Sequence, residues 1–466
     1  MFHVKQKGLT ESDTIAALAT PFGVGGLGVI RISGPKALEV ALKVFRPKSP
    51  PFELPPRKVR YGFVYDPSSG EVVDEAIAVY MKAPYSYTRE DVVELSCHGG
   101  YLVLRKVLEL VLKSGAREAL PGEFTKRAFL NGRIDLAQAE AVLELISAQS
   151  EQALRLAERQ LEGVLSKRIA SLKGRLIGLV APLEAWLDLP EEEVPEPSVE
   201  ELREGLKGVL EEVEELLGHW RQEVVYREGV KTAFVGRANV GKSSLFNALL
   251  GRDRAIVTPI PGTTTDVIEE TVIIEGIPFC LMDMAGIGRP KDPVEEEGVR
   301  RARRKFEEAD LLLLVFDLGG PLEDEDLELL RQVEEAGKPY LLVLNKRDLP
   351  WAFDPKEVAK APFVLTSALT GEGLKELREA MARVVLKAHG VGSPSELVPL
   401  NTRHKRVLER ARAKVLGIME GLEGTLKGDL LLYELRELLD LLGEITGETT
   451  PEEVLEEIFS RFCIGK

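Results

Sequence analysis

The amino-acid sequence predicts a multidomain α/β plus all-α fold, in which a P-loop unit with a mostly parallel sheet is inserted into a helical domain behind an N-terminal α+β domain. Three observations predict this fold class: a phosphate-loop motif near residue 240, apolar strands that alternate with helical patterns to about residue 386, and helical spacing on both sides of that stretch. Insertion is tolerated because the two ends of a domain often lie close together. The expected domains are residues 1–127, 128–227, 228–386 and 387–466.

Length, charge and cysteine content narrow the class of protein. A chain of 466 residues suggests about two to four domains, and a net charge of −15 provides no global basic field, so any contact with RNA must be local. Cys97, Cys280 and Cys463 are widely separated, which argues against a disulfide framework or a zinc cluster. A secretory leader and an apolar run long enough to cross a bilayer are both missing, so we expect a cytoplasmic protein with no membrane segment.

The N-terminal domain reads as mixed α/β. Residues 29–32 and 76–81 have strand patterns, and residues 102–112 have helical spacing. The glycines of residues 23–28 precede a strand rather than a helix, so we reject a dinucleotide-binding interpretation. The adjacent Cys97 and His98 are interpreted as a strand end in preference to a metal-ligand pair.

The helical domain begins near Leu136. Apolar residues recur at three- and four-residue steps to Leu187, which predicts one or two long amphipathic helices that Pro182 should kink or end. An acidic, proline-bearing connection follows, and helical spacing resumes over residues 199–220 and again from residue 403 to the C-terminal region.

The phosphate loop reads G-x-x-x-x-G-K-S from Gly236 to Ser243, between the apolar run 230–235 and the helical pattern 245–250. Glycines allow backbone N–H groups to converge on phosphate oxygens, and the helix N-terminus adds a favourable dipole. In this context Lys242 reaches the β- and γ-phosphates and Ser243 binds Mg²⁺. The alternative is a glycine-rich turn that matches by chance, and the motifs that follow argue against it.

Further motifs in sequence order identify the base as guanine. Asp283 and Gly286 form D-x-x-G, where the carboxylate can hold Mg²⁺ through water and the glycine can sense the γ-phosphate. Asn345, Lys346 and Asp348 form N-K-x-D, whose carboxylate can accept from N1–H and the 2-amino group of guanine. Adenine offers neither donor, which argues against an ATPase. The switch threonines of residues 262–266 and the base-backing pair Ser367 and Ala368 complete the pattern.

Motifs outside this unit carry a resemblance to a known family. They are D-T-I-A-A from Asp13, R-I-S-G from Arg31, P-G-E-F-T from Pro121, N-G-R-I-D-L-A-Q-A-E-A from Asn131, G-E-I-T-G-E from Gly443 and F-C-I-G-K at residues 462–466. Over essentially its full length the chain resembles the MnmE (TrmE) family of bacterial tRNA-modification GTPases. The resemblance implies addition of a carboxymethylaminomethyl or aminomethyl group to carbon 5 of the tRNA wobble uridine. It also implies a homodimer and a flavoprotein partner, MnmG (GidA), which forms a heterotetramer or larger complex and is the source of FAD.

The resemblance also implies a reduced-folate site. The carbon donor is 5,10-methylene- or 5-formyl-tetrahydrofolate, and its ligands fall on Arg31, Glu94, Arg133 and Lys466. A carboxylate suits the amino and N3 protons of the pterin, and cations suit the glutamate tail. A paired structural carboxylate is the alternative for Glu94. Family members carry lysine where this chain has Arg133, so the charge is kept but the geometry differs.

The hydrolytic machinery departs from that of Ras, because Ile287 stands where Ras-type enzymes carry a water-orienting glutamine. The resemblance implies that K⁺ replaces the arginine finger when two G domains pair, with the ligands Asn239, Thr258, Ile260 and Thr263. It gives the water-orienting role to Glu295, with Glu296 and Glu297 as neighbours that a one-residue shift would select. Cys463 reads equally as a nucleophile or as a packed, merely reactive thiol.

The resemblance and the motifs together give the expected nucleotide site, with Ser243 and Thr264 as its Mg²⁺ ligands. The expected GTP-binding residues are Asn239, Val240, Gly241, Lys242, Ser243, Ser244, Thr258, Thr263, Thr264, Asp283, Gly286, Asn345, Lys346, Asp348, Ser367 and Ala368. The competing function is a regulatory GTPase switch in ribosome assembly without covalent tRNA chemistry. The N-terminal domain and the C-I-G-K terminus argue against it. The basic runs 300–305 and 403–406 fit either tRNA docking or solvated helix faces.

Overall fold

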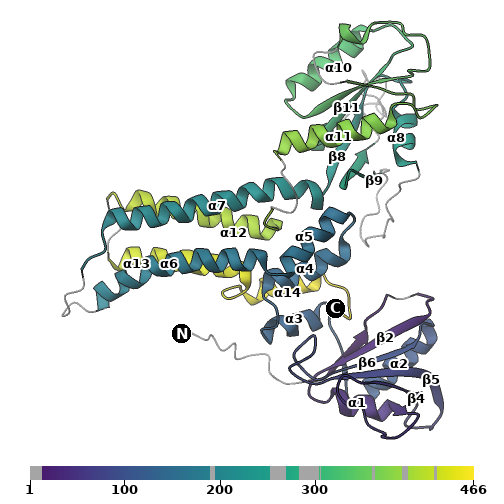
Figure 1. Cartoon of the computed structure of the whole chain (residues 1–466), viewed down its shortest axis with the longest axis vertical. Coiled ribbons are helices and arrows are strands. Elements are labelled where there is room, and N and C mark those ends of the chain that lie inside the picture. Colours follow the sequence, from purple (N-terminus) through teal and green to yellow (C-terminus); the bar gives the residue numbers. More distant parts are fainter. Residues whose placement is uncertain are drawn as a thin grey trace, which may run out of the picture. The chain divides into compact units, whose positions relative to one another are not determined.

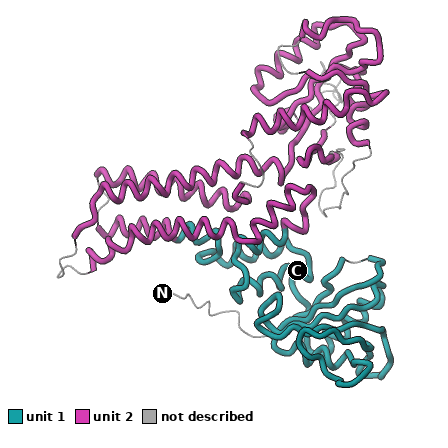
Figure 2. Tube along the Cα trace, in the orientation of Figure 1, with its two compact units in different colours: residues 1–143, 440–466 teal, residues 144–439 magenta. Residues whose placement is uncertain are grey.

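The computed structural model describes residues 13–21, 23–188, 195–251, 269–282, 304, 306–358, 363–390, 397–424 and 428–466. The chain divides into two compact units (Figure 2). Unit 1 comprises residues 1–143 and 440–466, and unit 2 comprises residues 144–439.

Unit 1 is built on a sheet that has seven strands within the described residues, in the order β3-β4-β5-β6-β2-β1-β7. Its strands are β1 (Ile15–Leu18), β2 (Leu27–Ser33), β3 (Phe45–Pro47), β4 (Val59–Tyr65), β5 (Val72–Met81), β6 (Val92–His98) and β7 (Arg117–Glu118). Its helices include α1 (Ala37–Val44), α2 (Tyr101–Lys113), α3 (Glu123–Leu130) and α14 (Glu452–Ser460). The expected strands at residues 29–32 and 76–81 and the helix at 102–112 are confirmed.

The alternation of side chains along β2 and β6 decides where the polar residues of unit 1 lie. Ile30, Ile32 and Leu95 are fully buried and pack with residues of α1 and α2 in one apolar core. The residues between them therefore point to the opposite face of the sheet. The antiparallel register pairs Arg31 directly with Glu94 on that face.

The end of β6 separates Cys97 from His98. The Cys97 thiol is buried in the core, and burial raises its pKa to about 12. His98 is exposed, and its Nδ1 lies 2.6 Å from Oδ1 of Asp74. The two side chains therefore point to different surroundings.

The helical region differs from the expectation of one or two helices, because residues 136–188, which are all described, form three. They are α4 (Leu136–Ser147), α5 (Glu151–Leu161) and α6 (Val164–Asp188). Ser150 starts α5 by accepting a hydrogen bond from the Ala153 N–H at 3.1 Å, and Gly163, with φ of +78°, separates α5 from α6.

The expectation for Pro182 is wrong in one respect, since α6 continues through this residue to Asp188. Proline removes the N–H that would bond to the carbonyl four residues earlier, at Gly178. Pro182 and Gly178 are both exposed, so water can satisfy that carbonyl. The helix therefore tolerates a proline on its solvent face.

Unit 2 inserts a second sheet between two helices that pack on each other, α7 (Val199–Arg227) and α12 (Thr402–Gly421). Figure 1 shows these two helices running side by side, with α6 alongside α13 (Asp429–Thr446). The chain leaves α7, builds the sheet and returns in α12. The insertion predicted from the sequence is confirmed.

The inserted sheet has six strands in the part of the chain that is described, in the order β13-β12-β11-β8-β10-β9, and its neighbouring strands there are parallel except for the β9–β10 hairpin. Its elements are β8 (Val230–Val235), α8 (Lys242–Leu250), β9 (Glu269–Ile274), β10 (Ile277–Met282), β11 (Leu311–Asp317), α10 (Asp324–Glu335), β12 (Tyr340–Asn345), the 3₁₀ turn Pro355–Glu357, β13 (Phe363–Leu365) and α11 (Leu374–His389).

Apolar clusters bury both faces of this sheet, which explains why its strands read as continuous apolar runs rather than alternating ones. The carboxyl ends of β8, β11 and β12 meet at one edge, where the functional loops begin. Among the described helices, none is both long and apolar enough to cross a membrane.

Candidate functional site

The phosphate loop joins the end of β8 to the start of α8. Its backbone has positive φ at Gly236 (154°), Asn239 (64°) and Gly241 (98°), a region that glycine adopts freely and asparagine tolerates. A Cβ atom on Gly236 would lie 2.4 Å from the main-chain oxygen of Val315, so only glycine lets the loop pass this close to β11. A loop of this shape in front of a helix N-terminus suits an anion such as a nucleotide phosphate.

The ammonium group of Lys242 is held inside this loop. Its Nζ donates to the main-chain oxygens of Gly236 at 2.7 Å and Arg237 at 2.6 Å, and its side chain is buried. Ser243 and Ser244 follow in the first turn of α8 with exposed side chains. The Ser243 hydroxyl is therefore accessible to a hard cation such as Mg²⁺, which prefers oxygen ligands.

The base-recognition residues lie at the ends of β12 and β13. The hydroxyl Oγ of Ser367 donates to Oδ1 of Asp348 at 2.5 Å, which orients a carboxylate on an otherwise exposed residue. Lys346, with φ of +65°, forms an ion pair with Asp317, in which Nζ lies 2.6 Å from Oδ2. Sequence reasoning missed Asp317. Asp317 ends an apolar strand, but its register with Asn345 is set by the sheet and cannot be read from the sequence.

The buried side chain of Asn345 joins three of the predicted motifs. Its Nδ2 donates to the main-chain oxygen of Val240 at 3.0 Å, in the phosphate loop. Its Oδ1 accepts from the Ala368 N–H at 3.1 Å and from the Thr366 hydroxyl at 3.3 Å. One amide therefore ties the phosphate loop and the S-A loop to the N-K-x-D motif.

The remaining predicted nucleotide and cation residues come from two stretches on either side of the β9–β10 hairpin. Thr258, Ile260, Thr263, Thr264, Asp283, Gly286 and Glu295 lie outside the described residues.

In unit 1 the predicted folate residues converge near the face of the sheet that lies opposite the α1 and α2 core. Nε of Arg31 lies 2.8 Å from Oε1 of Glu94, so Glu94 is paired, as its structural alternative requires. Arg133 donates from NH1 to the main-chain oxygen of Tyr87 at 2.8 Å. The guanidinium carbons of Arg133 and Arg31 lie 4.7 Å and 5.6 Å from the centre of the Tyr87 ring. Nothing in the sequence pattern marks Tyr87, so sequence reasoning missed it.

The C-terminal segment reaches the same place within unit 1. The Phe124 N–H donates to the main-chain oxygen of Lys466 at 3.1 Å, and the Gly122 N–H donates to that of Cys463 at 3.4 Å. NH1 of Arg31 lies 3.5 Å from the main-chain oxygen of Gly465. Arg31, Glu94, Arg133 and Lys466 are therefore brought together, while the Cys463 side chain is exposed.

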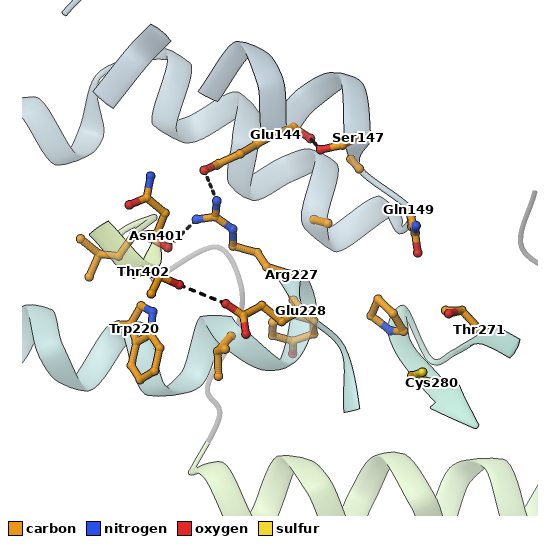
Figure 3. A pocket seen from close by; sticks show the side chains of 16 residues that line it. Glu144, Ser147, Gln149, Trp220, Arg227, Glu228, Thr271, Cys280, Asn401 and Thr402 are labelled. Atoms are coloured by element: carbon orange, nitrogen blue, oxygen red, sulfur yellow. Dashed lines mark hydrogen bonds and ion pairs between the residues drawn. The ribbon is translucent and has the colours of Figure 1, made fainter. Parts of the chain in front are cut away.

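A cavity of about 460 Å³ lies in unit 2 between the ends of α4 and α7, the β9–β10 hairpin and the start of α12 (Figure 3). The guanidinium of Arg227 is central to it. It contacts Glu144, the main-chain oxygen of Leu400 and Oε1 of Glu223, the last at 3.1 Å. Oε2 of Glu223 accepts from the Leu400 N–H at 2.5 Å. These contacts join the chain before the inserted sheet, at Glu223 and Arg227, to the chain after it, at Leu400.

Burial dominates the electrostatics of this cluster. The Glu223 side chain is fully buried, and desolvation raises its pKa from 4.5 to about 8 although Arg227 favours the charged form. Part of the basic run 403–406 belongs to the same region. His404 is buried at the start of α12, and Nζ of Lys405 lies 4.0 Å from the Trp220 ring. His404 and Lys405 therefore pack against other residues of unit 2, an arrangement that differs from both expected alternatives, tRNA docking and a solvated helix face.

Two regions of the chain match family models. Residues 136–463 match one described as the MnmE helical domain, and residues 14–133 match one described as the GTP-binding protein TrmE N-terminus. Among solved structures, the G domain of the T. maritima FeoB iron transporter is 34% identical over 33% of this chain and 98% of that chain, with a TM-score of 0.27.

Relatives named tRNA modification GTPase MnmE match along nearly the whole chain. Those of Geotalea uraniireducens (strain Rf4) and Geobacter sulfurreducens (strain ATCC 51573 / DSM 12127 / PCA) are 43% and 46% identical over 97% of this chain and 99% of theirs. That of Geobacillus kaustophilus (strain HTA426) is 44% identical over 98% of this chain and 100% of its own. Motifs, fold, phosphate loop and relatives agree, and the chain belongs to the MnmE family of tRNA modification GTPases.

Proposed function

We propose that this GTPase acts in the modification of carbon 5 of the tRNA wobble uridine, with a reduced folate as carbon donor and with K⁺ stimulating its GTP hydrolysis. The observation that carries the proposal is the convergence of Arg31, Glu94, Arg133 and the segment 463–466 around Tyr87 in unit 1. A pure GTPase switch has no need for this polar cluster, which is remote in sequence from every nucleotide motif.

The residues of this cluster fit the two ends of a folate. The Glu94 carboxylate can accept hydrogen bonds from the amino and ring N–H groups of a pterin, and its Oε1 already pairs with Nε of Arg31 at 2.8 Å. The Arg133 guanidinium is exposed beside Tyr87 and suits the carboxylates of a glutamate tail. The Tyr87 ring, close to both Arg31 and Arg133, offers a flat apolar surface. The donor chemistry itself, transfer of a one-carbon unit, belongs to the folate.

The residues of the phosphate loop fit GTP with Mg²⁺ and K⁺. Lys242, held by its two carbonyl partners, would reach the β- and γ-phosphates, and Ser243 would hold Mg²⁺, which neutralises phosphate charge. Asn239 presents an exposed amide from a left-handed backbone position, and an amide oxygen is a suitable ligand for a large monovalent cation. Asp348, oriented by Ser367, would select guanine.

The proposal includes partners that the family resemblance implies. These are a second copy of this chain, a flavoprotein of the MnmG type that carries FAD, and tRNA in the cytoplasm. The net charge of −15 supports a requirement for a partner or a local basic surface in RNA binding. The relatives' shared name, tRNA modification GTPase, supports the substrate class.

A paired measurement tests the proposal. Deletion of residues 463–466 should weaken calorimetric binding of 5-formyltetrahydrofolate and leave intrinsic GTP turnover unchanged, because the hydrogen bonds that Arg31, Gly122 and Phe124 donate to this tail all lie within unit 1. Nucleoside analysis of tRNA from cells lacking the protein should show an unmodified wobble uridine. Fully modified tRNA in those cells, together with no folate binding by the intact chain, would favour the regulatory GTPase instead.

A further inference from the structure

Arg237, the residue after the first glycine of the phosphate loop, is held at both of its ends. Its main-chain oxygen accepts a hydrogen bond from Nζ of Lys242 at 2.6 Å. Its side chain reaches the start of α10, where Nε donates to Oδ1 of Asp326 at 2.8 Å and NH1 contacts Oε1 of Glu323. The residue therefore connects the catalytic lysine to a neighbouring helix.

The two carboxylates that receive Arg237 differ in burial. The Asp326 side chain is 2% exposed, whereas that of Glu323 is 57% exposed. Asp326 also completes the N-terminal capping box of α10, because its Oδ2 accepts from the Glu323 N–H at 3.1 Å. One oxygen of Asp326 thus fixes the helix end, and the other fixes Arg237. Asp326 is therefore held in place by its own helix when it binds Arg237.

We propose that Arg237 is a positioning residue for GTP hydrolysis. Its buried pair with Asp326 fixes the oxygens of Gly236 and Arg237, and these oxygens set the direction from which Lys242 approaches the phosphates. A lysine ammonium has three donors. Two are directed by the loop oxygens, at 2.7 Å and 2.6 Å, so movement of the loop turns the ammonium as a whole. A displacement of about 1 Å in a catalytic group can cost roughly 10²-fold in rate.

The helix does not depend on Arg237 for its own capping, because the box between Glu323 and Asp326 closes through side-chain and main-chain atoms of α10. Loss of the guanidinium should therefore leave α10 formed and release the first turn of the phosphate loop. The main effect should appear where charge develops on the γ-phosphate rather than in the many contacts that bind nucleotide in the ground state.

The experiment measures GTP turnover and nucleotide affinity for three variants of the full chain: Arg237→Ala, Arg237→Lys and Asp326→Asn. We expect Arg237→Ala and Asp326→Asn to lower kcat about tenfold or more, while Kd for a fluorescent GDP analogue changes less than about threefold. Arg237→Lys keeps the positive charge but lacks the planar guanidinium that contacts Asp326 and Glu323 together, so its kcat should lie between those of Arg237→Ala and the wild type. The matched control is Arg331→Ala, which removes an exposed cation from α10 and should leave both constants unchanged.

Turnover is counted per nucleotide-binding site, so a partly unfolded preparation lowers the number of sites and not kcat. Wild-type kcat per site in Arg237→Ala would overturn the proposal. Equal losses in Arg237→Ala and Arg331→Ala would overturn it too, since any lost cation would then suffice. If Arg237→Ala does not fold, Asp326→Asn and Arg237→Lys decide, because wild-type kcat in both contradicts a role for the pair.

Discussion

A Cβ atom on Gly241 would lie 2.2 Å from Nδ2 of Asn345, the nitrogen that donates to the main-chain oxygen of Val240. The last glycine of the phosphate loop and the first residue of N-K-x-D therefore occupy adjoining space with no room for a methyl group. The phosphate-binding and base-binding halves of the nucleotide site are packed directly on each other.

Gly241→Ala should weaken GTP binding by at least about tenfold. The substitution strains a residue with φ of +98° and drives a methyl group into Asn345, and strained backbone of this kind costs about 1–3 kcal/mol. Fluorescence titration with a GTP analogue measures the effect. Gly178→Ala, at a position where an added Cβ meets nothing within 4 Å, is the control. Wild-type affinity in Gly241→Ala would show that the loop relaxes around the methyl group.

Asp348→Asn should move base preference from guanine towards xanthine. The amide loses the acceptor for the guanine 2-amino group and gains a donor for the C2 oxygen of xanthine, while Ser367 can still donate to the amide oxygen. Competition titrations with GTP and xanthosine triphosphate give the ratio of affinities. An unchanged affinity for GTP would contradict the role given to Asp348. Asp324→Asn, on the exposed start of α10, controls for the lost charge.

Potassium should accelerate GTP hydrolysis over sodium, and Asn239→Gly should abolish the difference. Glycine keeps the left-handed backbone at this position (φ of +64°) and removes the amide alone, so it isolates the amide better than alanine does. One positive charge at the transition state is worth roughly 10³–10⁵ in rate, by analogy with arginine fingers. Turnover is compared in matched potassium and sodium buffers. Equal wild-type rates in the two would remove the cation from the mechanism.

Glu223→Gln should make the stability of the chain less dependent on pH. Burial raises the pKa of Glu223 from 4.5 to about 8, so the unfolded chain releases this proton first as pH rises. The stability contributed by the protonated group is complete below about pH 4.5 and is lost as pH rises towards 8, with a magnitude on the order of a few kcal/mol.

The measurement for Glu223 compares Tm of wild type and Glu223→Gln at pH 5.5 and pH 8, since groups common to both chains cancel in the difference. The wild type should lose more stability between the two values than the variant does. Equal losses in the two chains would show instead that Arg227 keeps Glu223 ionised throughout this pH range.

Gly465→Ala should weaken folate binding without touching any side chain proposed to contact the ligand. Gly465 has φ of +93°, and a Cβ there would lie 2.1 Å from the main-chain oxygen of Leu18. The tail should therefore detach from β1 and release Arg31 from the Gly465 oxygen. Calorimetry with 5-formyltetrahydrofolate and GTP turnover are measured on the same preparation. Tight folate binding in this variant would exclude the tail from the site.

Local motifs in the sequence predicted the parts of the site that depend on local backbone. The phosphate loop follows the buried strand β8 and precedes the helix α8, as its sequence requires. N-K-x-D follows β12, which β11 separates from β8 in the sheet. The partners of these motifs were not predictable in the same way. Tyr87, Asp317 and the pair of Arg237 with Asp326 meet through tertiary contacts, and Arg237 is 89 residues from Asp326. The periodicity of apolar residues describes one helix or strand at a time, so it does not predict contacts between residues of different elements.

The helical region shows the complementary error. The three- and four-residue spacing of apolar residues is similar in α4, α5 and α6, and it continues across residues 147–150 and Gly163. The spacing therefore suggested fewer helices than the structure contains. The sequence signals for the two helix ends are the capping residue Ser150 and Gly163, and the spacing of apolar residues does not reveal them. Pro182 was overestimated because its effect depends on exposure, which periodicity did not supply.

The hydrogen bond between Glu223 and Leu400 joins residues that are 177 positions apart in the chain, and it determines the entropy cost of closing the loop that contains the inserted sheet. The closure entropy of a loop grows only with the logarithm of its length, by about 0.6 kcal/mol for each doubling. With its two ends already joined by Glu223 and Arg227, the inserted unit can therefore lengthen or shorten almost without cost to the pairing of α7 and α12. The pairing of the two helices therefore places little restriction on the length of the chain inserted between them.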